Sequence, residues 1–215
     1  MPRLRVSNLS VSLDGYAAGP RQSTDDPLGV GGEQLHTWMF DTRTGQAAHG
    51  GSGGATGVDD DWLARSETGI GATIMGRNMF GPIRGEWTGP AWTGWWGEDP
   101  PFHHPVFVLT HHPRQPQEMA GGTTFTFVSD GIESALAQAF AAAEGADVRL
   151  AGGAATVRQY LRAGLVDELH VVVVPVLLGS GERLLGDLAD APPLTCAEYE
   201  ASPAAAHYRL VRASS

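Results

Sequence analysis

The sequence predicts an α/β fold in which a mixed, mostly parallel sheet is flanked by helices and ends in an antiparallel hairpin. Through the middle of the chain, short apolar segments alternate with helical segments, which is typical of parallel strands joined by helices. The last two alternating segments, 194–201 and 206–213, follow one another across a short turn at Ser202 and Pro203, which favours a hairpin.

The expected strands are short runs of apolar and β-branched residues bounded by turn residues. They are 3–13, 72–76, 106–110, 124–128, 148–152 and 167–179. Pro175 lies inside the last of these runs. Because proline has no backbone N–H to donate, we expect a bulge or a sheet edge at this position.

The helices are predicted from apolar periodicity and end signals. Residues 59–71 begin with Asp59, Asp60 and Asp61, which we interpret as acids that complement the helix dipole. The clearest helix is 131–145, where apolar side chains recur on one face. A third is 154–164, and a helical turn is expected within 77–83.

All 215 residues fit a single domain, 1–215. Residues from about 20 to 57 are rich in glycine, and we expect a partly mobile insertion with a short helix near 33–40. Residues from about 81 to 104 form a loop with four tryptophans. These indoles either pack as a lid or contact surface, which is the more frequent fate of aromatic side chains, or stack on a flat ligand.

Composition excludes several classes of partner. The formal net charge of −10 opposes nucleic acid and anionic membranes, since both require a basic face. Cys196 is the single cysteine, so no internal disulfide forms, and we expect a cytoplasmic protein. The apolar run 169–179 is too short to span a bilayer. The neighbouring histidines lack ligand spacing, so no metal site is expected.

Three strand ends share polar residues and glycines that suit a nucleotide. They are Gly76-Arg77-Asn78, Thr110-His111-His112 and Gly152-Gly153. Ligands of open α/β sheets gather at the carboxyl ends of strands, and exposed N–H groups at a helix start suit phosphate. The sequence therefore predicts a cradle made of three loops. For the glycine pair alone the alternative is a tight turn, and for Arg77 alone it is a surface ion pair.

The order of five segments resembles the dihydrofolate reductase superfamily. The segments are "SLDGYAAGP", "IMGRNMF", "VLTHHP", "LAGGAATVRQYL" and "DELHVVVVPVLLGSGERLL". The resemblance is strongest to the C-terminal reductase domain of bifunctional riboflavin-pathway deaminase–reductases and to its stand-alone relatives. It covers nearly the whole chain apart from the insertion and the tryptophan loop. It implies the three-layer dihydrofolate reductase-like fold, NADPH as hydride donor and a homodimer.

The resemblance also assigns cofactor contacts residue by residue. The segment holding the pyrophosphate and adenosine phosphate matches Gly76, Arg77, Asn78 and Met79. The loop beside the 2′-phosphate matches Thr110, His111 and His112. The loop under the pyrophosphate and nicotinamide ribose matches Gly152, Gly153, Ala154, Ala155 and Thr156. The strand end and loop over the nicotinamide match Ser10, Ala17, Ala18 and Gly19.

The implied activity is reduction of a small heterocyclic substrate, and the nearest relatives imply 5-amino-6-(5-phosphoribosylamino)uracil. The proton would come from Asp14 or from an ordered water; alternatively Asp14 is a turn residue that bonds its own backbone. No carboxylate stands where dihydrofolate reductases hold the pterin, so dihydrofolate is not the expected substrate. The zinc pattern of a deaminase is also absent from the sequence. The alternative function is a non-catalytic module that binds a nucleotide or a flavin-like ligand.

Overall fold

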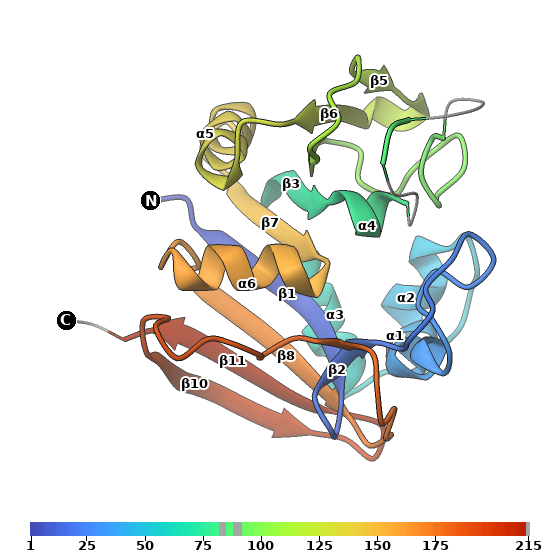
Figure 1. Cartoon of the computed structure of the whole chain (residues 1–215). Coiled ribbons are helices and arrows are strands. Elements are labelled where there is room, and N and C mark those ends of the chain that lie inside the picture. Colours follow the sequence, from blue (N-terminus) through green and yellow to red (C-terminus); the bar gives the residue numbers. More distant parts are fainter. Residues whose placement is uncertain (82–84, 88–91, 214–215) are drawn as a thin grey trace.

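The structure, a computed structural model, describes residues 1–81, 85–87 and 92–213 (Figure 1). Its centre is a nine-stranded sheet with the order β10-β11-β8-β1-β7-β3-β4-β6-β5. The strands are β1 (Leu4–Ser12), β3 (Ile70–Gly76), β4 (Pro105–Leu109), β5 (Gln117–Glu118), β6 (Thr124–Val128), β7 (Asp147–Gly152), β8 (Glu168–Val174), β10 (Leu194–Ala201) and β11 (Ala206–Arg212). The six strands from β8 to β6 are parallel, and β10 and β11 form an antiparallel hairpin, which confirms the predicted fold class.

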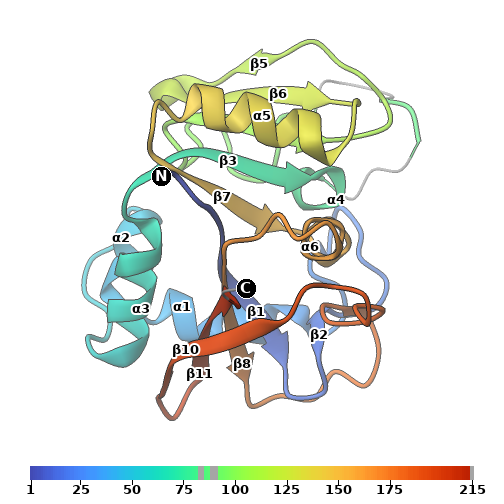
Figure 2. The same cartoon turned by 90° about the vertical axis from the view of Figure 1, so that its left-hand side faces the viewer.

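Helices cover both faces of the sheet (Figure 2). On the first face lie α5 (Ile132–Ala142) and α6 (Ala154–Arg162), whose buried side chains join those of Leu150 and Ile74 in one cluster. The second face carries η1 (Gly32–His36), α1 (Thr37–Phe40) and α3 (Val58–Glu67), which pack on β8. Tryptophans of the 81–104 loop cover β3, β4 and β6 on that same face.

Smaller elements complete the chain. They are β2 (Tyr16–Ala18) and β9 (Glu182–Arg183), which pair in a separate antiparallel sheet, α2 (Arg43–Ala48), α4 (Arg77–Phe80) and η2 (Ala120–Gly122). The sequence analysis predicted neither β2, β9 nor α2. Among the described residues, no helix combines the length and the apolar character needed to cross a membrane.

Strand β1 contains a bulge that adds one residue. Val6 pairs with Leu169 and Leu9 pairs with Val171, so Ser7 and Asn8 together stand opposite His170. Asn8 has a φ of 56°, in the left-handed region that asparagine tolerates better than most residues. Because the extra residue is absorbed here, Val6 and Leu9 both face the core under α6, whereas Arg5 and Ser7 face α3.

Two sequence-based expectations require correction. The run 167–179 was predicted as one long strand with an irregularity at Pro175, but β8 ends at Val174 because proline cannot donate to the ladder. The insertion contributes more to the core than its composition indicates, because Leu35 and Trp38 are fully buried against Val172. The expected helix near 33–40 is present as η1 and α1. Of the turn expected within 77–83, Pro82 and Ile83 lie outside the described residues.

Candidate functional site at the carboxyl ends of the parallel strands

The three predicted loops meet at one edge of the sheet. Gly76 ends β3 and Gly152 ends the neighbouring β7, where it pairs with Met75. On the other side of β3, Gly76 pairs with Leu109 of β4, so the loop that begins at Thr110 follows directly. Four adjacent parallel strands, β1, β7, β3 and β4, therefore bring these loops together, as the cradle hypothesis requires (Figure 2).

Gly76 owes its identity to packing between two protein elements. A methyl group at this position would collide with Oγ1 of Thr156 and lie 3.6 Å from the backbone nitrogen of Gly153. Any side chain would therefore push the end of β3 away from the start of α6. This contact holds the first and third loops of the cradle against each other.

The glycine pair has unusual backbone geometry. Gly152 has a φ of 136°, which favours glycine, and the Gly152–Gly153 peptide bond is cis. Gly153 itself has an ordinary φ of −71° and stands as the N-cap of α6, with no side-chain cap hydrogen bond. A methyl group on Gly153 would meet no protein atom within 4 Å. The space in front of the start of α6 is therefore open.

This open space fits the phosphates of a dinucleotide. The first amide groups of a helix have no partner within the helix and attract anions. No side chain caps them in α6, and Gly153 leaves the approach bare. On the cradle hypothesis, the pyrophosphate would be held by the backbone of Gly152, Gly153, Ala154, Ala155 and Thr156.

Trp87 joins the two loops that the sequence analysis assigned to the adenosine end. The Arg77 guanidinium lies over the Trp87 ring, 3.8 Å from its centroid. The Trp87 indole donates to the backbone oxygen of His112 at 2.7 Å. In the same loop, Oγ1 of Thr110 accepts from the N–H of His112 at 3.1 Å. Arg77 is thereby placed beside the loop that follows β4.

The described tryptophans of the 81–104 loop pack against the protein. Trp92 and Trp95 donate to the backbone oxygens of Phe80 and Met79 at 2.8 and 2.9 Å. Trp96 stacks on Phe125 in the cluster on the second face. The structure thus favours packing over ligand stacking, because these tryptophans lie over the part of the second face that β3, β4 and β6 form.

The residues assigned to the nicotinamide end lie near the end of β1, in β2 and directly after it. The Ser10 side chain is buried, and its hydroxyl accepts from the Trp38 indole at 2.9 Å. Gly19 donates to the backbone oxygen of Leu28 in the insertion. Asn78 reaches the insertion from the opposite side, since its Nδ2 donates to Gln22 at 3.1 Å. The insertion therefore borders the cradle.

Asp14 is held as a turn residue. Its carboxylate accepts from the Ser12 hydroxyl at 2.6 Å and from the N–H groups of Leu178 and Gly179 at 3.1 and 2.7 Å. The Ser12 hydroxyl, more than these amides, lowers the pKa of Asp14 to about 2. A carboxylate with this pKa carries no proton near neutral pH, so the geometry favours the turn interpretation over the role of acid.

The three aspartates at the start of α3 do more than complement its dipole. Buried Asp60 accepts from the N–H of Thr44 at 2.7 Å and pairs with Arg43 at 3.0 Å. Asp59 accepts from the Ser202 hydroxyl and contacts Nε2 of His207, both at 2.8 Å. The interpretation as caps was therefore incomplete, because two of the three carboxylates fasten α3 to α2 and to the terminal hairpin.

Histidines do not gather into a metal site within the described part of the chain, where no group of three His, Cys, Asp or Glu side chains could hold a metal ion. His104 instead contacts Oγ1 of Thr73 through Nε2 at 2.8 Å. Burial, with Arg149 nearby, lowers the pKa of His104 to about 4.

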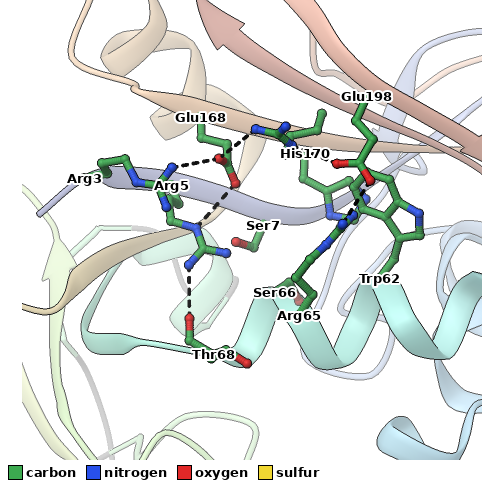
Figure 3. Close-up of a pocket in the computed structure, with 11 residues that line it drawn as sticks. Arg3, Arg5, Ser7, Trp62, Arg65, Ser66, Thr68, Glu168, His170 and Glu198 are labelled. Atoms are coloured by element: carbon green, nitrogen blue, oxygen red, sulfur yellow. Dashed lines mark hydrogen bonds and ion pairs between the residues drawn. The ribbon is translucent and has the colours of Figure 1, made fainter.

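A cavity that the sequence analysis missed lies on the second face near the amino end of β1 (Figure 3). Its volume is about 380 Å³, within the range of small-molecule sites. We call it the arginine pocket after four of its lining residues, Arg3, Arg5, Arg65 and Arg209. These come from β1, the segment before it, α3 and β11, so no local motif could have indicated the pocket.

The sequence model of the RibD C-terminal domain family matches residues 5–208. The chain belongs to this family. An uncharacterized protein of Bacillus subtilis (strain 168), YwjB, is 32% identical over 65 residues. That match covers 30% of this chain and only 37% of YwjB.

Solved structures share the dihydrofolate reductase-like fold. A putative riboflavin biosynthesis protein from Shewanella sp. PV-4 matches with a TM-score of 0.62 and 20% identity over the whole of both chains. A Thermotoga maritima diaminohydroxyphosphoribosylaminopyrimidine deaminase/5-amino-6-(5-phosphoribosylamino)uracil reductase gives 0.57 and 14%, covering 99% of this chain and 57% of that one. Dihydrofolate reductase from Enterococcus faecalis, complexed with NADP(H), gives 0.53 and 13%, covering 99% and 97%.

Proposed function

We propose that this chain is an NADPH-dependent reductase of a small heterocyclic substrate. The observation that carries the proposal is the open space in front of Gly153, at the uncapped start of α6. Membership of the RibD C-terminal domain family supports the same function. The substrate we propose is 5-amino-6-(5-phosphoribosylamino)uracil, which the Thermotoga maritima neighbour is named for reducing.

The chain's own residues would bind and orient the reactants. The backbone from Gly152 to Thr156 holds the pyrophosphate, and Arg77 with Thr110 and His111 holds the adenosine 2′-phosphate. When bound, NADPH supplies the hydride. Fixing both reactants in one geometry supplies much of the rate. Because the Asp14 carboxylate is committed to a turn, we assign proton delivery to an ordered water. We further propose that the protein is a homodimer.

Arg77→Ala tests the cofactor assignment. A charge-assisted hydrogen bond contributes about 1.5–3 kcal/mol, and about 1.4 kcal/mol corresponds to tenfold in affinity. The variant should therefore bind NADPH roughly ten- to a hundredfold more weakly. NADH binding should change much less, because NADH lacks the 2′-phosphate. Calorimetric titration of both cofactors into both proteins gives the measurement.

Arg77→Lys is the matched control, because it keeps the positive charge and should retain part of the preference for NADPH. Equal loss of both cofactors in Arg77→Ala would place Arg77 at the pyrophosphate or in the fold. If wild-type protein binds neither cofactor, the reductase proposal fails. Binding of NADPH without its consumption, in the presence of 5-amino-6-(5-phosphoribosylamino)uracil and other heterocycles, would support the non-catalytic binding module instead.

A further inference from the structure

We propose that the arginine pocket is a second ligand site, which binds a small hydrophilic organic anion through a phosphate or carboxylate group. The pocket lies where β1 and β8 begin, whereas the cofactor edge lies where the parallel strands end. The inference is therefore independent of the proposed reductase function.

The charge on the pocket wall selects an anion. Four arginines line the cavity together with two glutamates, Glu168 and Glu198, and Asp147 pairs with Arg3 and Arg5 just outside it. The lining itself therefore holds four cations and two carboxylates, with Asp147 and Glu200 next to lining residues, in a chain whose formal net charge is −10. A local excess of positive charge in an acidic protein concentrates oxyanions and repels cations.

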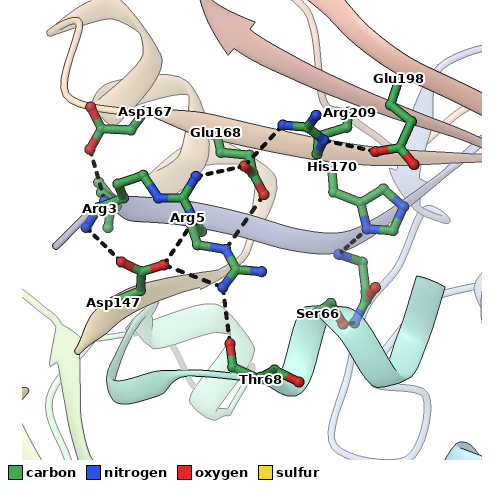
Figure 4. Close-up of polar contacts among 12 residues, drawn as sticks. Arg3, Arg5, Ser66, Thr68, Asp147, Asp167, Glu168, His170, Glu198 and Arg209 are labelled. Carbon is green, nitrogen blue, oxygen red and sulfur yellow. Dashed lines mark hydrogen bonds and ion pairs between the residues drawn. The ribbon is translucent and has the colours of Figure 1, made fainter. Parts of the chain in front are cut away.

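Three of the arginines converge on one carboxylate, that of Glu168. Arg3 and Arg209 donate to Oε2 of Glu168 at 3.2 and 3.4 Å, and Nε of Arg5 lies 3.5 Å from its Oε1 (Figure 4). Arg5 is more than nine-tenths buried, and its Nη1 donates to the Thr68 backbone oxygen at 3.1 Å and to Asp147 at 3.4 Å. The side chains of Arg3 and Arg65 are half-exposed and that of Arg209 is about one-third exposed, so a ligand oxyanion would add charge-assisted bonds to these three arginines.

The wall of the pocket is rigid. The Trp62 ring is buried and stacks on His170, with centroids 4.6 Å apart, and on His207 at 5.3 Å. The Arg65 guanidinium covers the same ring at 4.0 Å, and its Nη1 donates to Glu198 at 2.9 Å. Arg65 is therefore held in place before any ligand arrives, which lowers the entropic cost of binding.

The size and lining of the pocket indicate an organic ligand. A cavity of about 380 Å³ exceeds a single oxyanion, since one water occupies about 30 Å³ in the liquid. The Trp62 ring already contacts the His170 ring and the Arg65 guanidinium, so it is occupied by protein groups. Instead Ser7, which Figure 3 places between Arg5 and His170, adds a hydroxyl to the wall. The ligand class is thus a polar compound with at least one anionic group.

Calorimetric titrations with inorganic phosphate and, separately, with succinate test the proposal at low ionic strength. Wild-type protein should bind at least one of them, and the tighter one tells phosphate esters from carboxylates. Arg65→Gln should weaken binding by about tenfold or more, because one charge-assisted contact is lost. Arg65 is half-exposed and Glu198 keeps its contact with Arg209, so this variant should fold. Arg162→Gln, which removes the same charge from the exposed end of α6, should bind as wild type.

Glu198→Gln gives an effect of opposite sign, which misfolding could not produce. It removes a carboxylate that competes for Arg65 and Arg209, so anion binding should become severalfold tighter. The proposal is overturned if wild-type protein binds neither anion, or if Arg65→Gln and Arg162→Gln bind equally well. It is also overturned if saturating NADPH abolishes anion binding, because the anion would then occupy the cofactor edge.

Discussion

The cofactor edge and the arginine pocket are two candidate sites at opposite ends of the same strands, and they are built differently. At the cofactor edge, the candidate site is formed by the backbone: Gly153 leaves an open approach and Gly76 allows close packing. In the arginine pocket, long charged side chains from three distant segments, around Arg5, Arg65 and Arg209, are held against one another. A site built from backbone shape can be recognised in consecutive residues of the sequence. A site built from charged side chains of distant segments has almost no local sequence motif.

The sharpest test of this contrast substitutes two glycines at the same edge. Gly76→Ala should lower the free energy of unfolding by about 1–3 kcal/mol, because its methyl group overlaps Thr156. Gly153→Ala should change it by less than about 0.5 kcal/mol, since the methyl group enters open space with a permitted φ. Urea unfolding measures both. Equal destabilisation would show that the space before Gly153 is not open.

Gly153→Ala should nevertheless weaken NADPH binding, because the added methyl group occupies the space that we assign to the pyrophosphate.

A double variant, Gly76→Ala with Thr156→Ala, should regain part of the stability lost in Gly76→Ala alone. Absence of any recovery would mean that Thr156 is not the group that the methyl meets.

At the arginine pocket the corresponding test is pH dependence. Burial is the main cause that lowers the pKa of His170 to about 3, and the nearby charges of His207, Arg65 and Arg5 lower it further. The unfolded chain takes up this proton near pH 6.5, so the stability that neutral His170 contributes is present above that pH and is lost as pH falls toward the folded pKa. When the pH is lowered from about 7.5 to about 5.5, protonation of His170 in the unfolded chain should reduce the free energy of unfolding by about 1.4 kcal/mol.

Urea unfolding of wild type and His170→Gln at the two pH values isolates this contribution. Titrating groups that do not contact His170, including His104, act alike in both proteins and cancel in the difference, whereas His207 bonds His170 and shares in the difference. The decline should be smaller in the variant by about the amount given above. The same decline in both would show that the pKa of His170 in the folded protein is close to its unfolded value, and hence that burial does not lower it.

The smallest effect is expected at Asp14. If the carboxylate is a turn residue, Asp14→Asn should reduce the turnover of any confirmed substrate by less than about tenfold, well below the roughly 10²–10⁴-fold that a general acid contributes. Steady-state kinetics with NADPH gives the measurement. A loss in the range of a general acid would restore Asp14 to the catalytic machinery.

The contrast between the two sites explains how much the sequence could predict. Periodicity indicated the sheet, the main helices and the terminal hairpin, because each depends on neighbouring residues. The glycines of "LAGGAAT" indicated a backbone feature for the same reason. Nothing local predicts that Arg5, Arg65 and Arg209 meet, since they converge only after β1, α3 and β11 have assembled. The contacts of Asp59 and Asp60 escaped prediction similarly, because their partners lie on other elements.

The extra residue in β1 has a consequence for the direction of a hydrogen-bond chain. The N–H of Asn8 can only donate, and it contacts Nδ1 of His170 at 3.3 Å, so the proton of neutral His170 resides on Nε2. Nε2 of His170 then donates to Nδ1 of His207 at 3.1 Å, and Nε2 of His207 donates to the Asp59 carboxylate. One inserted residue thus sets the donor-to-acceptor direction of a chain of hydrogen bonds. This chain runs from the arginine pocket to a second cavity, which is lined by Asp59. Deleting Asn8 would leave the pairing of β1 regular and would remove the N–H that fixes the direction of these hydrogen bonds.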